Sequence, residues 1–321
     1  MKVKKLSGRL GVRYEHTIQN VKYLLGKGDN FKKDFDDVVP SASIGWKLTD
    51  MSNLRLGYNM RIYRPGIWYL NPYLNDSNPT NITQGNPNLD SEKSHAFNLS
   101  YSNFTQKFNV NLSLRYSFTN NSIEQISEMV PDTEIEGLKE TTGKEVLYST
   151  YQNIGKTKNA SLSGYINWNA TSNTRIYANI YGNYSYMEGA NGLKNDGWNL
   201  FAYGGAQQTL PHDWRISLNV FGQTPWIMLQ GKGSSFFDYG LSVNKSFLDK
   251  RLTLSAFASN FFKKYMDQSS TTEGAGFIRE SSYKYSRQRF GISVSYRIGE
   301  LKASVKKAAR TISNDDVKSG T

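Results

Sequence analysis

The side chains that most often carry enzyme chemistry are scarce in this sequence and far apart. The chain has no cysteine, which excludes thiol catalysis, disulfide bonds and cysteine-ligated zinc. Its three histidines, His16, His95 and His212, stand alone, without a second ligand at a metal-binding spacing. None of them belongs to a recognisable nucleophile–histidine–acid motif. We therefore expect no enzyme activity, no metal site and no bound cofactor.

One segment concentrates acidic side chains. In residues 119–158 the acidic residues outnumber the lysines, and apolar and polar residues alternate at 122–130 and again at 145–152. This alternation predicts a hairpin that projects from the rest of the protein. Two readings stay open: a solvated hairpin, or an acidic lip that collects a cationic or metal-chelate substrate. In the second reading, Glu134 and Glu136 are candidate ligand contacts.

The elements that would position such residues are β-strands, because apolar and polar residues alternate with a period of two. From Phe108 to Phe118 the even positions are apolar or aromatic and the odd positions are polar or charged. That length matches the roughly 9–11 residues with which a tilted strand crosses a bilayer. The same pattern predicts twelve strands, at about 6–16, 39–49, 53–62, 94–103, 107–118, 159–169, 173–184, 199–209, 213–222, 236–247, 251–262 and 287–298.

The links between these strands alternate in length. Short links fall at 50–52, 103–106, 170–172, 210–212 and 248–250, and long ones at 17–38, 63–93, 119–158, 185–198, 223–235 and 263–286. Short periplasmic turns and long extracellular loops are typical of outer-membrane barrels. A soluble β-sandwich also alternates, but its strands are shorter, at about 5–6 residues. We therefore predict an all-β fold, an antiparallel transmembrane β-barrel.

Composition agrees with a membrane barrel. The chain has 21 Tyr, 16 Phe and 6 Trp although its mean hydropathy is −0.59. It has no apolar run of about 18 residues, so no transmembrane helix is expected. The net charge of +12 is spread along the chain without a nucleic-acid-binding motif. We expect no nucleic-acid partner, and instead outer-membrane lipid and lipopolysaccharide, whose phosphates suit exposed Lys and Arg.

Large polar side chains are expected inside the barrel. Arg61 falls on the polar face of its strand, where an arginine is far less costly than facing lipid. Tyr177 and Tyr181 fall on the same kind of face in a later strand. These three residues are candidate ligand contacts in the lumen.

The long link at 63–93 carries a specific motif. The motif begins in the last two residues of the preceding strand and reads Arg61-Ile-Tyr-Arg-Pro-Gly-Ile-Trp-Tyr-Leu-Asn-Pro-Tyr73, followed by Asn78-Pro-Thr-Asn-Ile-Thr-Gln-Gly-Asn-Pro-Asn-Leu-Asp-Ser-Glu92. Its prolines stiffen the chain as it leaves a strand, and Gly-Asn-Pro-Asn is typical of a turn. This motif resembles that of TonB-dependent receptor barrels, especially the outer-membrane β-barrel family typical of Bacteroidetes. The loop either closes the barrel mouth or contacts ligand; in the second case the candidates are Arg61, Arg64, Trp68, Asn71 and Asn86.

The resemblance implies a barrel of about 22 strands with a plugged lumen. Residues 1–298 would be the C-terminal part of this barrel, without the plug domain and the N-terminal strands, and residues 299–321 a basic periplasmic tail. The full-length protein would work with the TonB complex to take up a scarce nutrient (a siderophore, vitamin or oligosaccharide), with a surface lipoprotein as a possible further partner. Because no signal peptide follows Met1, we expect the chain to be a fragment. The alternative is a standalone barrel of about twelve strands that acts as a passive pore or adhesin.

Overall fold

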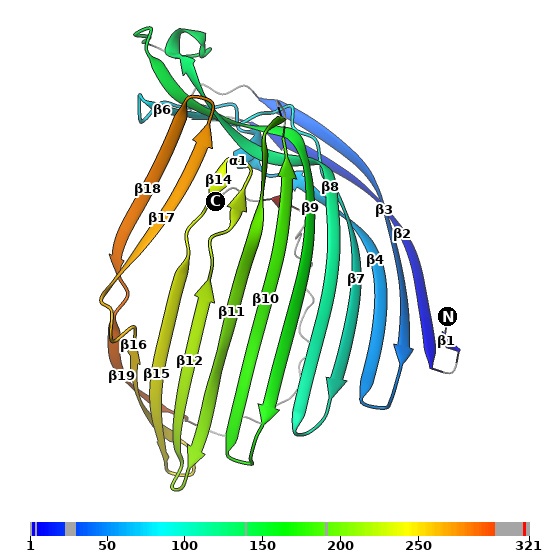
Figure 1. Ribbon diagram of the computed structural model, residues 1–321, viewed down its shortest axis with the longest axis vertical. Coiled ribbons are helices and arrows are strands. Elements are labelled where there is room, and N and C mark those ends of the chain that lie inside the picture. The colour runs from blue at the N-terminus through cyan, green and yellow to red at the C-terminus, as the bar shows by residue number, and fades with distance from the viewer. Residues whose placement is uncertain are drawn as a thin grey trace.

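The computed structural model describes residues 2–3, 5–22, 30–138, 140–189, 192–298 and 317–318. Twelve long antiparallel strands form one curved wall, in which each strand pairs with the next in the sequence (Figure 1). They are β2 (Leu6–Val21), β3 (Phe31–Lys47), β4 (Ser52–Pro65), β7 (Glu92–Phe104), β8 (Phe108–Pro131), β9 (Glu145–Asn169), β10 (Thr174–Glu188), β11 (Lys194–Leu210), β12 (Trp214–Gln223), β15 (Phe236–Phe247), β16 (Leu252–Ser259) and β19 (Arg289–Tyr296). The predicted fold class and strand order are confirmed.

The short turns gather at one end of the wall, at the bottom of Figure 1, and mark its periplasmic end. Three of these turns have the same hydrogen bond, in which a threonine hydroxyl accepts from the backbone N–H three residues later. The N–O distances are 3.0 Å from Ser52 to Thr49, 2.9 Å from Phe108 to Thr105 and 2.9 Å from Thr174 to Thr171. Such hydroxyl-closed turns reverse the chain in few residues, which keeps this end of the barrel compact.

The long connections lie at the opposite, extracellular end and contain most of the remaining elements (Figure 1). These are α1 (Ile67–Leu70), β5 (Leu74–Asn75), β6 (Asn81–Gln84), a 3-10 turn (Asp132–Glu134), β13 (Ile227–Met228), β14 (Gly231–Lys232), β17 (Tyr265–Gly274) and β18 (Phe277–Ser286). Strands β13, β14, β17 and β18 form a separate small sheet. No helix in the described part of the chain is long and apolar enough to cross a membrane.

The two faces of the wall differ as the alternation predicts. On the outer face, paired leucines such as Leu114 and Leu162 are 55% and 59% exposed, and the strands on either side add further apolar side chains. On the inner face the neighbouring residues are polar: Ser113 donates a hydrogen bond of 2.6 Å to Oδ1 of Asn98. An exposed apolar outer face and a polar inner face are what a lipid-embedded barrel requires.

Buried apolar residues collect at the extracellular end, where the loops pack on one another. One cluster joins Tyr69, Leu70, Leu89 and Ile123, and a second joins Val39, Met60 and Ile62. The loops above the membrane therefore have a packed core of their own, whereas the wall below them relies on its hydrogen-bonded ladder and on lipid.

Several strands extend well beyond the predicted spans. The link predicted at 17–38 is largely strand, because β2 runs to Val21 and β3 begins at Phe31, and residues 23–29 lie outside the described part. The hairpin predicted within 119–158 is confirmed as the continuation of β8 and β9, which pair up to Pro131 and Glu145. These extensions carry the wall above the bilayer.

Two features concern the ends of the chain. Among the described residues, β19 pairs with β16 alone, and β2 pairs with β3 and with the short β1 (Lys2–Val3), so no ladder closes the wall into a ring. Most of the predicted periplasmic tail lies outside the described residues, but β20 (Val317–Lys318) pairs in parallel with Arg64 and Pro65. These two residues therefore do not lie at the periplasmic end, where the tail was predicted. Pairing of β3 with β4 stops at Asn59, so the backbone N–H and C=O groups on that edge of β4 beyond Asn59 are open to a short strand.

Candidate functional site

The loop between β4 and β7 is folded back on itself by backbone hydrogen bonds. The N–H of Gly85 donates to the carbonyl of Asn71 at 2.9 Å, and the N–H of Asn86 donates to the carbonyl of Tyr69 at 2.6 Å. Glycine is required at position 85, because a Cβ there would lie 2.3 Å from the Asn71 carbonyl oxygen. The α1 turn buries Tyr69 and Leu70 and leaves Trp68 70% exposed.

The same loop is attached to the projecting β8–β9 hairpin. Strand β6 adds to the edge of β9 in parallel, with Asn81 opposite Leu147 and Thr83 opposite Ser149. Ile82, between them, is 1% exposed and packs against Ile135 and Val146. The loop and the hairpin therefore form one folded unit at the extracellular end.

A cavity of about 670 Å³ lies between this loop and the hairpin. Aromatic, amide and hydroxyl side chains line it, together with one glycine, and none of them is charged at neutral pH. The lining residues are Trp68, Asn71, Tyr73, Asn75, Thr83, Gln84, Gly85, Gln125, Ser149 and Tyr151. We call it the mouth cavity.

Several lining groups are fixed by their neighbours. The Gln84 amide donates to the carbonyl of Pro72 at 2.8 Å and accepts from the Tyr148 hydroxyl at 2.8 Å. This hydroxyl is protonated at neutral pH, and burial raises the pKa of Tyr148 further above its usual range. The Tyr151 ring packs edge-on against Tyr69, with 4.4 Å between ring centroids. The cavity is thus preformed.

Other lining groups have spare hydrogen-bonding capacity. Within the described residues, the side chains of Tyr73, Thr83 and Gln125 make no hydrogen bond, and Tyr73 and Gln125 are exposed. A hydroxyl both donates and accepts, and an amide offers one acceptor and two donors. The cavity can therefore bind a ligand that presents both donors and acceptors.

The structure brings together only some of the residues singled out in the sequence. Trp68 and Asn71 line the mouth cavity. Asn86 lies beside it, but its amide donates to the carbonyl of Tyr151 at 2.8 Å and accepts from the N–H of Asn88 at 2.9 Å. Arg61 is exposed on the inner face of β4. These four residues stay predictions as ligand contacts.

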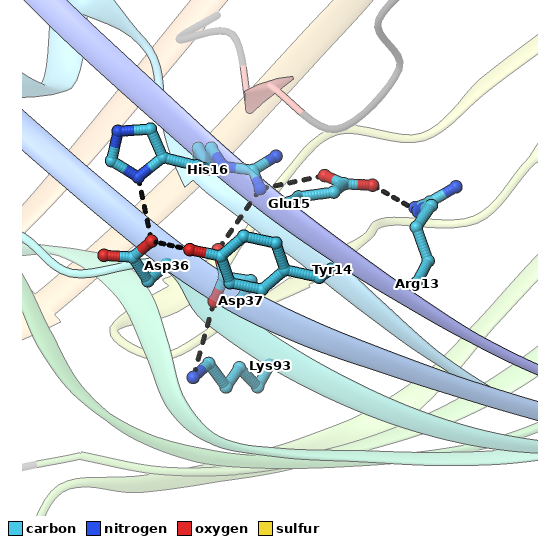
Figure 2. Close-up of polar contacts among 8 residues, drawn as sticks. Arg13, Tyr14, Glu15, His16, Asp36, Asp37 and Lys93 are labelled. Carbon is cyan, nitrogen blue, oxygen red and sulfur yellow. Dashed lines mark hydrogen bonds and ion pairs between the residues drawn. The ribbon is translucent and has the colours of Figure 1, made fainter.

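Arg64, from the same motif, is 1% exposed and lies in an ion-pair network. Its partners Glu15 and Asp37 are labelled in Figure 2. One of its terminal nitrogens lies 2.9 Å from Glu15 and 3.2 Å from Asp37, and Lys93 lies 3.4 Å from the second oxygen of Asp37. Arg13 pairs with the far oxygen of Glu15. Because Glu15 and Asp37 come from β2 and β3, Arg64 ties these strands to β4.

The remaining candidates lie apart from the mouth cavity. Tyr177, on the inner face of β10, donates a hydrogen bond to Asn219, and its ring centroid lies 5.8 Å from that of Tyr203. Arg175 covers the Tyr177 ring at 5.5 Å. Tyr181 follows on the same face and is 37% exposed. Together they form an aromatic lining of the lumen.

Glu134 and Glu136 are exposed at the tip of the β8–β9 hairpin. The tip is organised by Asp132, whose carboxylate accepts hydrogen bonds from the Thr142 hydroxyl at 2.7 Å, the Thr142 N–H at 2.6 Å and the Gly143 N–H at 2.7 Å. These bonds hold the pKa of Asp132 below its usual range. In the described part of the chain, no group of three or more His, Asp or Glu side chains is placed to hold a metal ion.

Sequence reasoning missed most of the mouth cavity. Tyr73, Thr83 and Gln84 lie within the motif, but nothing in their local sequence says which side chains face a ligand. Gln125 and Tyr151 come from the hairpin, where they lie directly opposite each other on β8 and β9. The alternation of apolar and polar residues along the hairpin could have predicted that these two side chains share one face. It could not have predicted that this face lies opposite the loop at 66–89.

Comparison with known proteins agrees with this fold. The model of the "Outer membrane protein beta-barrel family" matches residues 1–296. No curated protein sequence matches the chain. Solved structures with a similar fold include the copper transporter OprC, at 14% identity and a TM-score of 0.61, covering 92% of this chain and 45% of that one.

Two further similar structures are the FrpB iron transporter from Neisseria meningitidis and the siderophore receptor PirA from Pseudomonas aeruginosa. FrpB shares 11% identity with a TM-score of 0.60 and covers 92% of this chain and 44% of that one. PirA shares 15% identity with a TM-score of 0.55 and covers 90% of this chain and 49% of that one. The chain thus spans about half the length of these proteins. The extent of the family match shows that this chain belongs to the outer membrane protein beta-barrel family of the bacterial outer membrane.

Proposed function

We propose that this chain is the C-terminal part of the barrel of a TonB-dependent receptor that takes up a scarce nutrient from outside the cell. The observation that carries the proposal is the open wall: twelve strands match about half of a transporter barrel over nearly the whole chain. The likeness to receptors and transporters for copper, iron and siderophores supports nutrient uptake as the common task.

In this proposal the chain makes no covalent bond with its cargo. The nutrient binds at the extracellular end, where the mouth cavity and the acidic hairpin tip are exposed. A plug domain in the full-length protein fills the lumen, and the TonB complex displaces it. The inner-face arginines and tyrosines, including Arg61, Tyr177 and Tyr181, then contact the plug or the passing nutrient. A surface lipoprotein is a further expected partner above the loops.

The apolar outer face is expected to contact lipid, and lysines near the extracellular rim to contact lipopolysaccharide phosphates. Lys263, Lys264 and Lys284 are exposed there, at or near the β17–β18 hairpin. Phosphate groups attract such side chains even when both are solvated, although salt weakens the attraction.

The first test is an immunoblot of purified outer membranes with antiserum against residues 119–158. A band far larger than 36.4 kDa supports the receptor, and a membrane band near 36.4 kDa supports the standalone barrel of about twelve strands. The second test is conductance of the purified native protein in a planar bilayer. A plugged receptor should pass little current, whereas a passive pore should conduct steadily.

A further inference from the structure

We propose that the mouth cavity binds an uncharged oligosaccharide. This inference rests on the proposed function, because it names the substrate class of the same receptor. The motif and the barrel by themselves leave the nutrient open, but the side chains that line the cavity restrict its chemistry.

The charge of the lining restricts the ligand. The lining contains no lysine, arginine, histidine, aspartate or glutamate. Anionic ferric chelates are bound most strongly where cations face them, and cationic ligands where carboxylates face them. Acidic side chains do lie nearby, with Glu134 and Glu136 exposed at the hairpin tip, but they are outside the lining and would repel an anion. An uncharged ligand therefore fits this lining best, because it needs no opposite charge from the cavity.

The aromatic rings of the lining are arranged to receive a sugar. Trp68 is 70% exposed and Tyr73 is 51% exposed, although both are large side chains in a folded loop. Tyr151 is held in place by its edge-on contact with Tyr69. Flat rings of this kind pack against the C–H faces of sugar rings, and their polar ends reach the hydroxyl groups at the same time.

The hydrogen-bonding groups of the lining match those of a sugar. Thr83 and Gln125 have side chains without a partner in the described structure, and Gln84 is oriented by Pro72 and Tyr148. Sugar hydroxyls donate and accept at once, and mixed amide and hydroxyl groups match that pattern without a charge. A volume of about 670 Å³ suits a short stretch of a longer oligosaccharide, because small-ligand sites usually measure about 300–1,000 Å³.

The test uses the full-length receptor purified in detergent. An array of uncharged oligosaccharides, including maltohexaose, xylohexaose, cellohexaose and chitohexaose, is screened and the best binder is titrated by calorimetry; a ferric catecholate chelate is titrated in parallel. We expect an oligosaccharide to bind with an affinity that salt leaves unchanged, since a neutral ligand releases no counterions. Trp68→Ala should weaken this binding at least tenfold, as expected for a central aromatic contact.

The matched control is Ile67→Ala, which truncates the neighbouring α1 residue. Ile67 is 52% exposed and lies outside the cavity lining, so this variant should bind as the parent does. If no uncharged oligosaccharide binds, if Trp68→Ala leaves the affinity unchanged, or if only the chelate binds and salt weakens it, the inference is wrong.

Uptake in cells with and without TonB separates this inference from the proposed function. TonB-dependent uptake of the chelate, without sugar binding, would refute the oligosaccharide site and keep the receptor. Sugar binding that depends on Trp68, with uptake that does not depend on TonB, would keep the site and refute TonB-driven transport.

Discussion

Replacing Arg64 by methionine should release the outer ends of β2 and β3 from β4. The guanidinium is 1% exposed and lies between Glu15, whose side chain is 21% exposed, and Asp37, which is 2% exposed. Breaking a buried ion pair costs about 3–5 kcal/mol, because the remaining charge stays buried without its partner. Lys93 still reaches Asp37 at 3.4 Å, so we take the lower end, about 3 kcal/mol, for Arg64→Met.

Hydrogen exchange of the full-length receptor in detergent measures this effect. The ladder pairs Thr17 with Phe35 and Gln19 with Lys33, and its amides exchange when the outer hairpin opens. A loss of about 3 kcal/mol corresponds to exchange roughly 150-fold faster in peptides covering 15–21 and 31–37. Peptides from the membrane-spanning part of β10 should keep the exchange rates of the parent.

Two control variants separate the Arg64 network from other causes of faster exchange. Arg61→Met removes an arginine that is exposed on the same strand and should change exchange of the outer hairpin little. The double variant Arg64→Met/Asp37→Asn leaves no charge at position 37 and should recover much of the lost protection, because removing both partners of a buried pair costs less than removing one. If Arg64→Met matches Arg61→Met, or if the double variant exchanges as fast as the sum of its single changes predicts, the network does not hold the hairpin.

Three further results are expected. Gly85→Ala places a Cβ 2.3 Å from the Asn71 carbonyl oxygen, and such overpacking costs about 1–3 kcal/mol, so ligand binding at the mouth cavity should weaken while the receptor still gives a folded band on unheated gels. The pKa of Asp132 is held below 3.8 in the folded hairpin, so its contribution to stability is present above the unfolded value of 3.8 and is lost as the pH falls through the lower, folded value. A spin label at Thr141→Cys should therefore become more mobile as the pH falls below 3.8, whereas in Asp132→Asn, which has no carboxylate to protonate, it should already be mobile at neutral pH; a label in Asp132→Asn that is as immobile at neutral pH as in the parent would contradict this. Residues 1–321 expressed alone should aggregate or pair through the open edges of β2 and β19, seen as oligomers by light scattering, and a stable monomer would argue for a closed small barrel.

The positions of the strands within the bilayer were predictable because lipid on one face and the lumen on the other require apolar and polar residues to alternate. Leu112 and Leu114 face lipid and Ser113 faces the lumen, so the sequence between Phe108 and Phe118 records the two environments residue by residue. The turns were predictable for a related reason, since short links allow few conformations and favour residues such as Thr105.

The strand extensions were harder to predict because this physical signal ends at the membrane surface. Above it, both faces of β2 and β3 meet water or other protein segments, so apolar side chains no longer mark one face. Asp36 and Asp37 illustrate the loss of pattern: Asp36 is exposed and pairs with His16, whereas Asp37 is buried against Arg64. Adjacent and chemically identical residues have opposite environments, which depend on packing between β2, β3 and β4.

The motif at 61–92 shows why the candidate site was only partly predictable. Arg64 and Trp68 lie four residues apart, and both looked like ligand contacts, yet one is buried in ion pairs and the other is open to solvent. The difference arises from Pro65 and Gly66, where the chain leaves β4 and enters α1, and from Glu15, which reaches Arg64 from β2. A local motif can therefore identify the loop that forms a barrel mouth. Which of its residues holds the loop and which meets the ligand depends on distant strands, since Arg64 is bound by Glu15, 49 residues away, and by Asp37, 27 residues away. Gln125 and Tyr151 likewise complete the mouth cavity without belonging to the motif, because the hairpin supplies the opposite side of the site. The parallel pairing of β6 with β9 brings the loop and the hairpin together.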